Sequence, residues 1–112
     1  MKHIILVEDL DETRTWLENL LQTAFGGAMV TAVSTVGKAM GALDRSTFDL
    51  AIIDLSLPDG SGIEVVKKIQ QTSPETVSVV ATIFDDDKHL FAALRAGAQG
   101  YLLKDQPEEQ LL

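Results

Sequence analysis

Five short apolar runs divide the chain, and segments with helical spacing separate them. The runs are rich in Ile, Val and Leu and occupy residues 3–7, 29–33, 50–54, 77–82 and 100–104. Continuous apolar runs, as opposed to alternating ones, are typical of parallel strands that are covered on both faces. The pattern therefore predicts an α/β fold in which a strand followed by a helix is repeated five times.

The helical segments carry their own start and stop signals. Residues 10–25 and 62–72 place apolar side chains on one side at helical spacing. Ser61 followed by Glu64 has the spacing of a capping box at the start of the second of these helices. Gly97 stands where a left-handed glycine would end the helix before the last strand.

The last residues predict the beginning of one more helix. Pro107, Glu108 and Glu109 are typical of a first helical turn, and the sequence stops at Leu112. A helix of two turns would be marginal and would leave part of the sheet uncovered. We therefore expect residues 1–112 to form one domain whose final helix is incomplete, with further chain beyond it.

Composition narrows the classes of function. The 112 residues are 46% hydrophobic, which fits one globular domain, and carry a formal net charge of −8. This charge argues against direct binding of nucleic acid, which requires clustered Lys and Arg. The chain has no cysteine, hence no disulfide, and no apolar stretch long enough for a signal peptide or a membrane span. We expect a cytoplasmic protein without membrane contact.

Polar side chains gather where the predicted strands end. Glu8 and Asp9 follow the first strand, Asp54 ends the third, Thr82 the fourth and Lys104 the fifth. The carboxyl ends of parallel strands meet at one edge of the sheet, which is where α/β proteins bind ligands. We therefore expect three carboxylates, a hydroxyl and an ammonium to meet there.

This set of side chains has a definite chemistry. Crowded carboxylates repel one another unless one is protonated or a cation lies between them. Mg²⁺ takes oxygen ligands, keeps several waters and often adds a phosphate oxygen to its shell, so the pattern predicts a Mg²⁺ site open on one side. An aspartate can also act as a nucleophile that carries a phosphoryl group, whose charge Lys104 and Thr82 would offset.

Several motifs occur in a fixed order: LVEDLDE at 6–12, DLSLPDGSG at 54–62, a lone Thr82, and AALRAGAQGYLLKD at 92–105. Together they resemble the receiver domain of bacterial two-component response regulators, over essentially the whole chain. The resemblance implies a flavodoxin-like, doubly wound parallel sheet with strand order 2-1-3-4-5 and helices on both faces. The segment LLKD resembles the branch whose members carry a helix-turn-helix DNA-binding output domain.

The resemblance also implies roles at the site. Asp54 would accept a phosphoryl group from a sensor histidine kinase, with Mg²⁺ as cofactor and Lys104 as charge partner. Asp9 would bind the metal directly, Glu8 more through water, and Ser56 through its backbone carbonyl. The domain would not be an enzyme with an external substrate, and it would catalyse only its own phosphorylation and dephosphorylation.

A second group of residues is implied to control switching and rate. Thr82 would be the switch hydroxyl and Tyr101 the aromatic ring that changes rotamer, although Tyr101 as plain core filling is an alternative. Ser56, Ile83 and Phe84 lie at positions that tune the rate. Ile83 stands where the family usually has a small residue, which together with Phe84 implies slow chemistry.

Other polar residues have simpler interpretations. Asp85, Asp86 and Asp87 precede a helix, where acids act as caps without any metal. His3 begins a strand and His89 lies on a short helix without a partner histidine, so structural or surface roles are expected for both.

Two other functions compete with the phosphorylated switch. One is a receiver-like interaction module that works unphosphorylated. The other is a Mg²⁺-dependent phosphatase of the haloacid dehalogenase type with Asp54 as nucleophile; such enzymes have a second aspartate two residues on, where this chain has Ser56. For the switch, the expected partners are the kinase, an output domain outside this chain controlling transcription, and alternatively a second copy of the chain.

Overall fold

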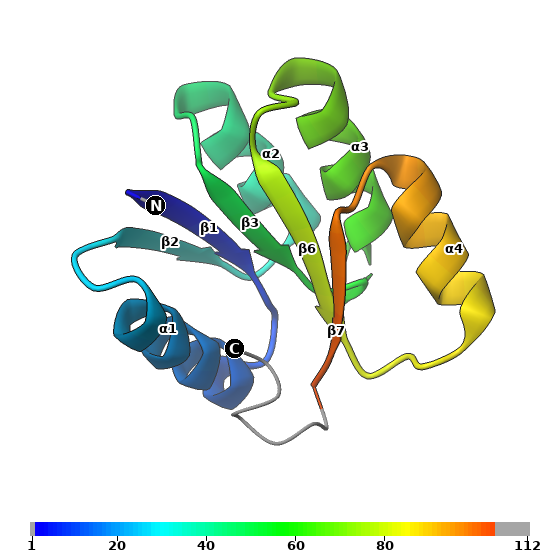
Figure 1. Ribbon diagram of the computed structural model, residues 1–112, viewed down its shortest axis with the longest axis horizontal. Helices are drawn as coiled ribbons and strands as arrows, with labels where there is room; N and C mark the ends of the chain where they lie inside the picture. The colour runs from blue at the N-terminus through cyan, green and yellow to red at the C-terminus, as the bar shows by residue number, and fades with distance from the viewer. Residues whose placement is uncertain (1, 105–112) are drawn as a thin grey trace.

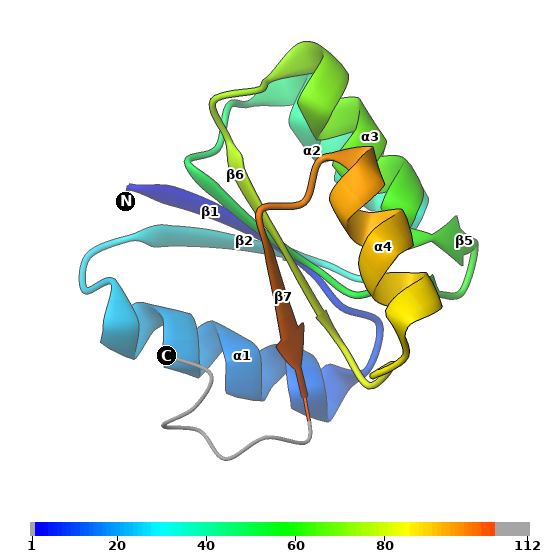
Figure 2. The same cartoon turned by 45° about the vertical axis from the view of Figure 1, so that its right-hand side comes forward.

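The computed structural model describes residues 2–104, and their main feature is a five-stranded parallel sheet (Figures 1 and 2). The strands are β1 (His3–Val7), β2 (Met29–Val33), β3 (Leu50–Ile53), β6 (Val77–Thr82) and β7 (Gly100–Leu103). They lie in the order β2-β1-β3-β6-β7, which confirms the predicted order 2-1-3-4-5. β3 and β7 end one residue earlier than predicted, so Asp54 and Lys104 each lie just beyond a strand.

Four helices connect these strands: α1 (Asp11–Ala24), α2 (Val36–Arg45), α3 (Gly62–Thr72) and α4 (Asp87–Ala96). Ser61 caps α3 by accepting a hydrogen bond from the Ile63 amide, not from the Glu64 amide that a capping box would use. Gly97 ends α4 with φ of 117°, as predicted. Within residues 2–104, no helix has the length and apolar character needed to cross a membrane.

The helices cover the two faces of the sheet unequally. α2, α3 and α4 lie on one face, and α1 lies on the other, as both views show (Figures 1 and 2). Alternate residues of the central strands point to opposite faces of the sheet. Ile5 and Ile53 pack with α2, α3 and α4, whereas Leu6 and Ile52 pack with α1. This explains the continuous apolar runs, because both faces of β1 and β3 are buried.

A small hairpin follows β3 and was not predicted. β4 (Ser56–Leu57) and β5 (Gly60–Ser61) pair antiparallel and are joined by Pro58 and Asp59. Two-residue strands are too short to produce a periodic pattern, so the sequence could not reveal them.

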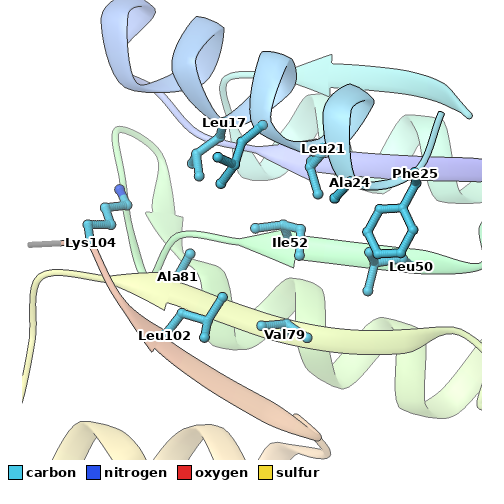
Figure 3. A pocket seen from close by; sticks show the side chains of 11 residues that line it. Leu17, Leu21, Ala24, Phe25, Leu50, Ile52, Val79, Ala81, Leu102 and Lys104 are labelled. Atoms are coloured by element: carbon cyan, nitrogen blue, oxygen red, sulfur yellow. The ribbon is translucent and has the colours of Figure 1, made fainter. Parts of the chain in front are cut away.

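An apolar groove lies between α1 and the sheet face that α1 covers (Figure 3). Its volume is about 360 Å³, and Lys104 is the one charged residue among those that line it. The lining residues are Leu17, Leu20, Leu21, Ala24, Phe25, Leu50, Ile52, Val79, Ala81, Leu102 and Lys104. The predicted fifth helix, which begins near Pro107, lies outside the described residues.

Candidate functional site

Backbone hydrogen bonds fix the residues that follow the strands. The Asp54 amide donates to the carbonyl of Val7 at 2.9 Å, and the Lys104 amide donates to the carbonyl of Thr82, also at 2.9 Å. The Glu8 amide likewise donates to the last carbonyl of β2, at 3.0 Å. Each of these residues therefore continues the ladder by one step, and its side chain leaves the sheet at the carboxyl edge.

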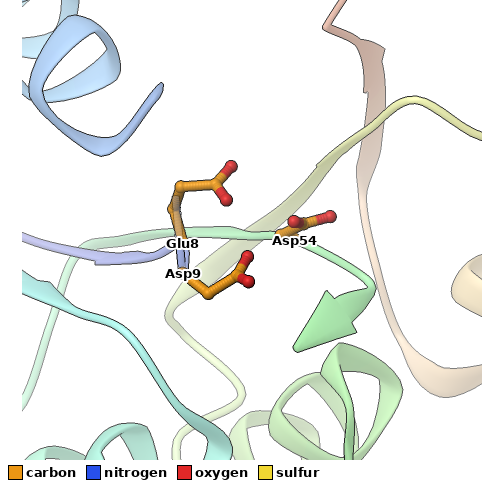
Figure 4. A group of neighbouring side chains, drawn as sticks. All are labelled: Glu8, Asp9 and Asp54. Atoms are coloured by element: carbon orange, nitrogen blue, oxygen red, sulfur yellow. The ribbon is translucent and has the colours of Figure 1, made fainter. Parts of the chain in front are cut away.

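Three carboxylates meet at this edge, as the sequence predicts (Figure 4). Glu8, Asp9 and Asp54 each offer an oxygen within 4.8 Å of the others. Glu8 and Asp54 are buried, whereas Asp9 is partly exposed. The cluster is therefore accessible to solvent mainly from the side of Asp9.

Lys104 neutralises part of this negative charge. Its ammonium forms ion pairs with a carboxylate oxygen of Glu8 and, at 3.0 Å, with Oδ2 of Asp54. The Lys104 side chain is only 12% exposed, so little water screens these pairs. The lysine thus lies beside Asp54, where it would also contact a group attached to that carboxylate.

Burial raises the pKa of the Glu8 carboxyl above its ordinary value. The hydrogen bonds that Glu8 accepts from Lys104 and from the Leu10 amide act in the opposite direction but do not cancel this effect. A nearby cation would favour the charged form of the carboxyl group and lower its pKa.

The donor set fits a hard divalent cation. All three side chains offer carboxylate oxygens, the ligands that Mg²⁺ prefers. Among residues 2–104, the Asp9 carboxylate makes no hydrogen bond or ion pair. It is therefore available to bind a metal without first breaking another interaction.

The chain after Asp54 is packed tightly around it. The Ser56 amide donates to Oδ1 of Asp54 at 3.3 Å. A Cβ placed on Gly62 would lie 2.0 Å from the Asp54 carbonyl oxygen, so only glycine allows α3 to begin this close to the end of β3. The Gly62 amide also donates to the carbonyl of Leu55 at 3.0 Å.

Thr82, Phe84 and Tyr101 form a connected group beside the carboxylates. Thr82 is buried, and its hydroxyl accepts a hydrogen bond from the Phe84 amide at 3.4 Å. The Tyr101 hydroxyl donates to the Phe84 carbonyl at 2.7 Å. Ile83, between Thr82 and Phe84, is 69% exposed. The backbone of Phe84 is thus held on both sides by the two residues expected to act in switching.

Of the three acids expected as caps, Asp86 makes the capping contact, and His89 and His3 have structural contacts. Asp86 caps α4 by accepting from the His89 amide, and its carboxylate also pairs with the His89 ring at 2.6 Å. That ring stacks on Phe84 with centroids 4.1 Å apart. His3 contacts the Thr47 carbonyl through a ring nitrogen at 3.0 Å.

Two residues that support the site, Arg14 and Asp59, were not predicted from the sequence. Arg14 donates to the carbonyl of Glu8 at 3.0 Å and so supports the backbone of the acidic pair. Asp59 accepts hydrogen bonds from the amides of Val36 and Gly37 at 2.8 and 2.9 Å. Both bind backbone groups, which no pattern of side chains in the sequence marks.

Comparisons with known proteins agree with this geometry. The family model described as the response regulator receiver domain matches residues 4–112. The oxygen regulatory protein NreC of Staphylococcus haemolyticus (strain JCSC1435) is 36% identical over 110 residues, covering 97% of this chain and 51% of that protein. The chain thus spans about half the length of the curated relatives it matches.

Solved structures are similar over nearly the whole chain. The BeF3-activated DrrB receiver domain has a TM-score of 0.89 and 29% identity, covering 100% of this chain and 92% of that one. The phosphorylated cyanobacterial phytochrome response regulator RcpA has a TM-score of 0.86 and 25% identity, covering 98% of this chain and 85% of that one.

Proposed function

Because the chain belongs to the response regulator receiver domain family, we propose that it is a phosphorylation-dependent signalling switch that accepts a phosphoryl group on Asp54. The observation that carries this proposal is the arrangement at the end of β3. Asp54 lies there with two further carboxylates within 4.8 Å and the Lys104 ammonium at 3.0 Å.

The donor would be the phosphohistidine of a sensor kinase. A carboxylate oxygen of Asp54 attacks the phosphorus, the new P–O bond forms as the P–N bond breaks, and the imidazole leaves with the electrons of that bond. Such transfer depends mainly on positioning and on neutralising the phosphoryl oxygens. Lys104 supplies one positive charge for this purpose.

Mg²⁺ would supply the other positive charge. Asp9 would bind the ion directly, Glu8 more through water, and the Ser56 backbone carbonyl would add a further oxygen. The spacing of the Glu8, Asp9 and Asp54 oxygens, within 4.8 Å of one another, supports this assignment, because a cation between the carboxylates would offset their mutual repulsion.

The response to phosphorylation would be cooperative. A hydrogen bond to a charged group contributes about 1.5 to 3 kcal/mol, whereas moving an equilibrium from 1:99 to 99:1 requires about 5.5 kcal/mol. Thr82 alone is therefore insufficient. We infer that Thr82 and Lys104 move together toward the phosphoryl group and that Tyr101 changes rotamer, which alters the surface along α4, β7 and the predicted fifth helix.

The altered surface would bind an output domain or a second copy of the chain. Because the chain spans about half of its curated relatives, an output domain beyond residue 112 is consistent with their length. We propose that this output domain binds DNA and controls transcription, because the LLKD segment resembles the branch of the family that carries a helix-turn-helix output domain. We also propose a cytoplasmic location.

Ile83 and Phe84 would set the lifetime of the phosphoryl group. Phe84 is stacked on His89, which holds an apolar ring on the loop that follows Thr82. Water that attacks the phosphoryl group would meet this apolar surface, so slow dephosphorylation is expected.

The test is intact mass after incubation with Mg²⁺ and acetyl phosphate, for the wild type and Asp54→Asn. We expect one added phosphoryl group in the wild type, only with Mg²⁺, and none in the variant. No phosphorylation of a folded, Mg²⁺-binding wild type would instead support an interaction module that works unphosphorylated. Steady release of phosphate from an external ester would support the phosphatase alternative.

A further inference from the structure

Asp59 connects the chain after the phosphoacceptor to a distant helix. Its two carboxylate oxygens accept hydrogen bonds from the amides of Val36 and Gly37, at 2.8 and 2.9 Å. Asp59 belongs to the hairpin β4–β5, whereas Val36 and Gly37 begin α2, more than 20 residues earlier in the sequence. The contact therefore joins two elements that the sheet alone does not hold together.

Side chains accept hydrogen bonds from all of the first three backbone amides of α2, those of Val36, Gly37 and Lys38. Thr35 caps this helix by accepting from the Lys38 amide at 3.0 Å. Asp59 accepts from the two amides that precede Lys38. The first amides of a helix have no acceptor within the helix, and the helix dipole favours negative charge beside them. The backbone bonds to Gly37 and Val36 lower the pKa of Asp59, so its carboxylate is charged at neutral pH.

The hairpin has few other attachments. Leu57 is buried in the core, and Gly60 lies against Val36, whose Cγ2 would be 3.6 Å from a Cβ at this glycine. Ser56 is exposed; it pairs with Ser61 of the same hairpin, and its amide donates to Oδ1 of Asp54 at 3.3 Å, so this end of the hairpin is tied to β3 and not to α2. Without Asp59, the outer end of the hairpin would keep only apolar contacts to α2, which do not fix its orientation.

We propose that Asp59 is a positioning residue for the Mg²⁺ site, because its bonds to α2 hold the hairpin that presents the Ser56 carbonyl. This inference rests on the proposed function. A carbonyl that is already held still loses little freedom when it binds an ion, whereas a mobile one must be ordered at a cost in affinity. Asp59 would thus improve metal binding without touching the metal.

The experiment compares Mg²⁺ affinity, measured by calorimetry, in the wild type, Asp59→Ala and Asp59→Asn. We expect the dissociation constant to rise about three- to tenfold in Asp59→Ala, the range set by the cost of ordering one short segment. Asp59→Asn removes the same charge but keeps one oxygen acceptor, so its Mg²⁺ dissociation constant should rise only about twofold. Amide hydrogen exchange at Val36 and Gly37, measured without metal, should accelerate in the same order.

Thr35→Ala is the matched control. It removes a cap from the same end of α2 but leaves both Asp59 bonds in place. We expect its Mg²⁺ affinity to equal that of the wild type even where its stability is lower. A general weakening of α2 would lower affinity in Thr35→Ala as much as in Asp59→Ala, and would overturn the proposal.

Three further outcomes would contradict it. Unchanged Mg²⁺ affinity in Asp59→Ala, with faster exchange at Val36 and Gly37, would make Asp59 a helix cap and nothing more. Equal losses in the alanine and asparagine variants would assign the effect to charge alone. Absence of Mg²⁺ binding by the wild type would overturn the proposed function together with this inference, whereas the first two outcomes leave the proposed function intact.

Discussion

The three carboxylates of Glu8, Asp9 and Asp54 do not all have a positively charged partner. Lys104 forms ion pairs with Glu8 and Asp54, whereas Asp9 has no cationic partner within residues 2–104. A third negative charge within 4.8 Å of the other two raises the free energy of the folded state when no metal is bound. The residue best placed to bind Mg²⁺ is thus the one that costs stability without it.

Asp9→Asn should therefore separate stability from metal binding. We expect the free energy of unfolding without Mg²⁺ to rise by about 1 kcal/mol, because one repulsive charge is removed. The Mg²⁺ affinity should fall by more than about tenfold, the lower bound for losing even an outer-shell partner of a metal. Urea unfolding with and without Mg²⁺ measures both effects, and an unchanged or lower metal-free stability would contradict the first.

The sequence predicted the site residues whose position follows from a strand end. Glu8, Asp9, Asp54 and Lys104 come together because parallel strands all point to one edge, which is a property of topology. Asp59 could not be found in this way. Its partners are two amides far along the chain, and their approach depends on how the hairpin folds back against α2.

Elements of this fold are joined by aspartates that bind backbone amides of distant segments. Asp49, just before β3, accepts from the amides of Lys2 and His3 at 2.9 and 3.0 Å and so fixes the start of β1. Asp59 does the same between the hairpin and α2. These backbone hydrogen bonds hold the pKa of both carboxyl groups below the ordinary value.

The direction of these pKa shifts predicts the response to acid. A carboxyl group whose pKa is lower in the folded state stabilises the protein fully above the unfolded pKa, and the stabilisation is lost as pH falls through the folded pKa. For Asp49 and Asp59 the unfolded value is 3.8, so the loss should occur below that pH.

The Asn variants of these two aspartates provide the test. Asp49→Asn and Asp59→Asn should each be less stable than the wild type at pH 6. Their deficit should narrow as pH falls from 3.8 toward 2.5, because the wild-type carboxyl group is then protonated as well. Denaturation midpoints across this range give the measurement, and a deficit that stays constant would show that the charged form is not what stabilises these junctions.

The regular elements were predicted from the pattern with errors of about one residue at their ends. β1, β2 and β6 have the same bounds as the predicted runs, because each strand coincides with one short run rich in apolar residues in the sequence. The hairpin β4–β5 was missed because each of its strands has only two residues, too few for a periodic pattern, and only Leu57 of the four is buried.

Across the whole molecule, the formal net charge is −8 and part of it is concentrated at one edge of the sheet. General repulsion and the local cluster should respond differently to salt. Monovalent salt screens all exposed charges as the Debye length falls from about 30 Å to about 3 Å between 0.01 and 1 M. A divalent ion bound between the carboxylates would stabilise the folded protein in addition to this screening.

We therefore expect MgCl₂ to stabilise the protein more than NaCl at equal ionic strength. At about 100 times the dissociation constant, specific binding would add about 2.7 kcal/mol to the free energy of unfolding. Thermal or urea unfolding at matched ionic strength measures the difference, with Asp54→Asn as the control that keeps the general effect and loses much of the specific one. Equal effects of the two salts on the wild type would contradict a Mg²⁺ site.

The ion pair between Lys104 and Glu8 joins residues that are 96 positions apart in the sequence. During synthesis, the acidic residues leave the ribosome long before their lysine, and strand pairing must reach β7 before the two charges meet. Closing so long a loop is slow, because contacts between distant parts of a chain form late in folding. A complete set of these side chains would therefore mark a molecule that has folded through β7, so that partly folded chains would lack the proposed phosphoacceptor site.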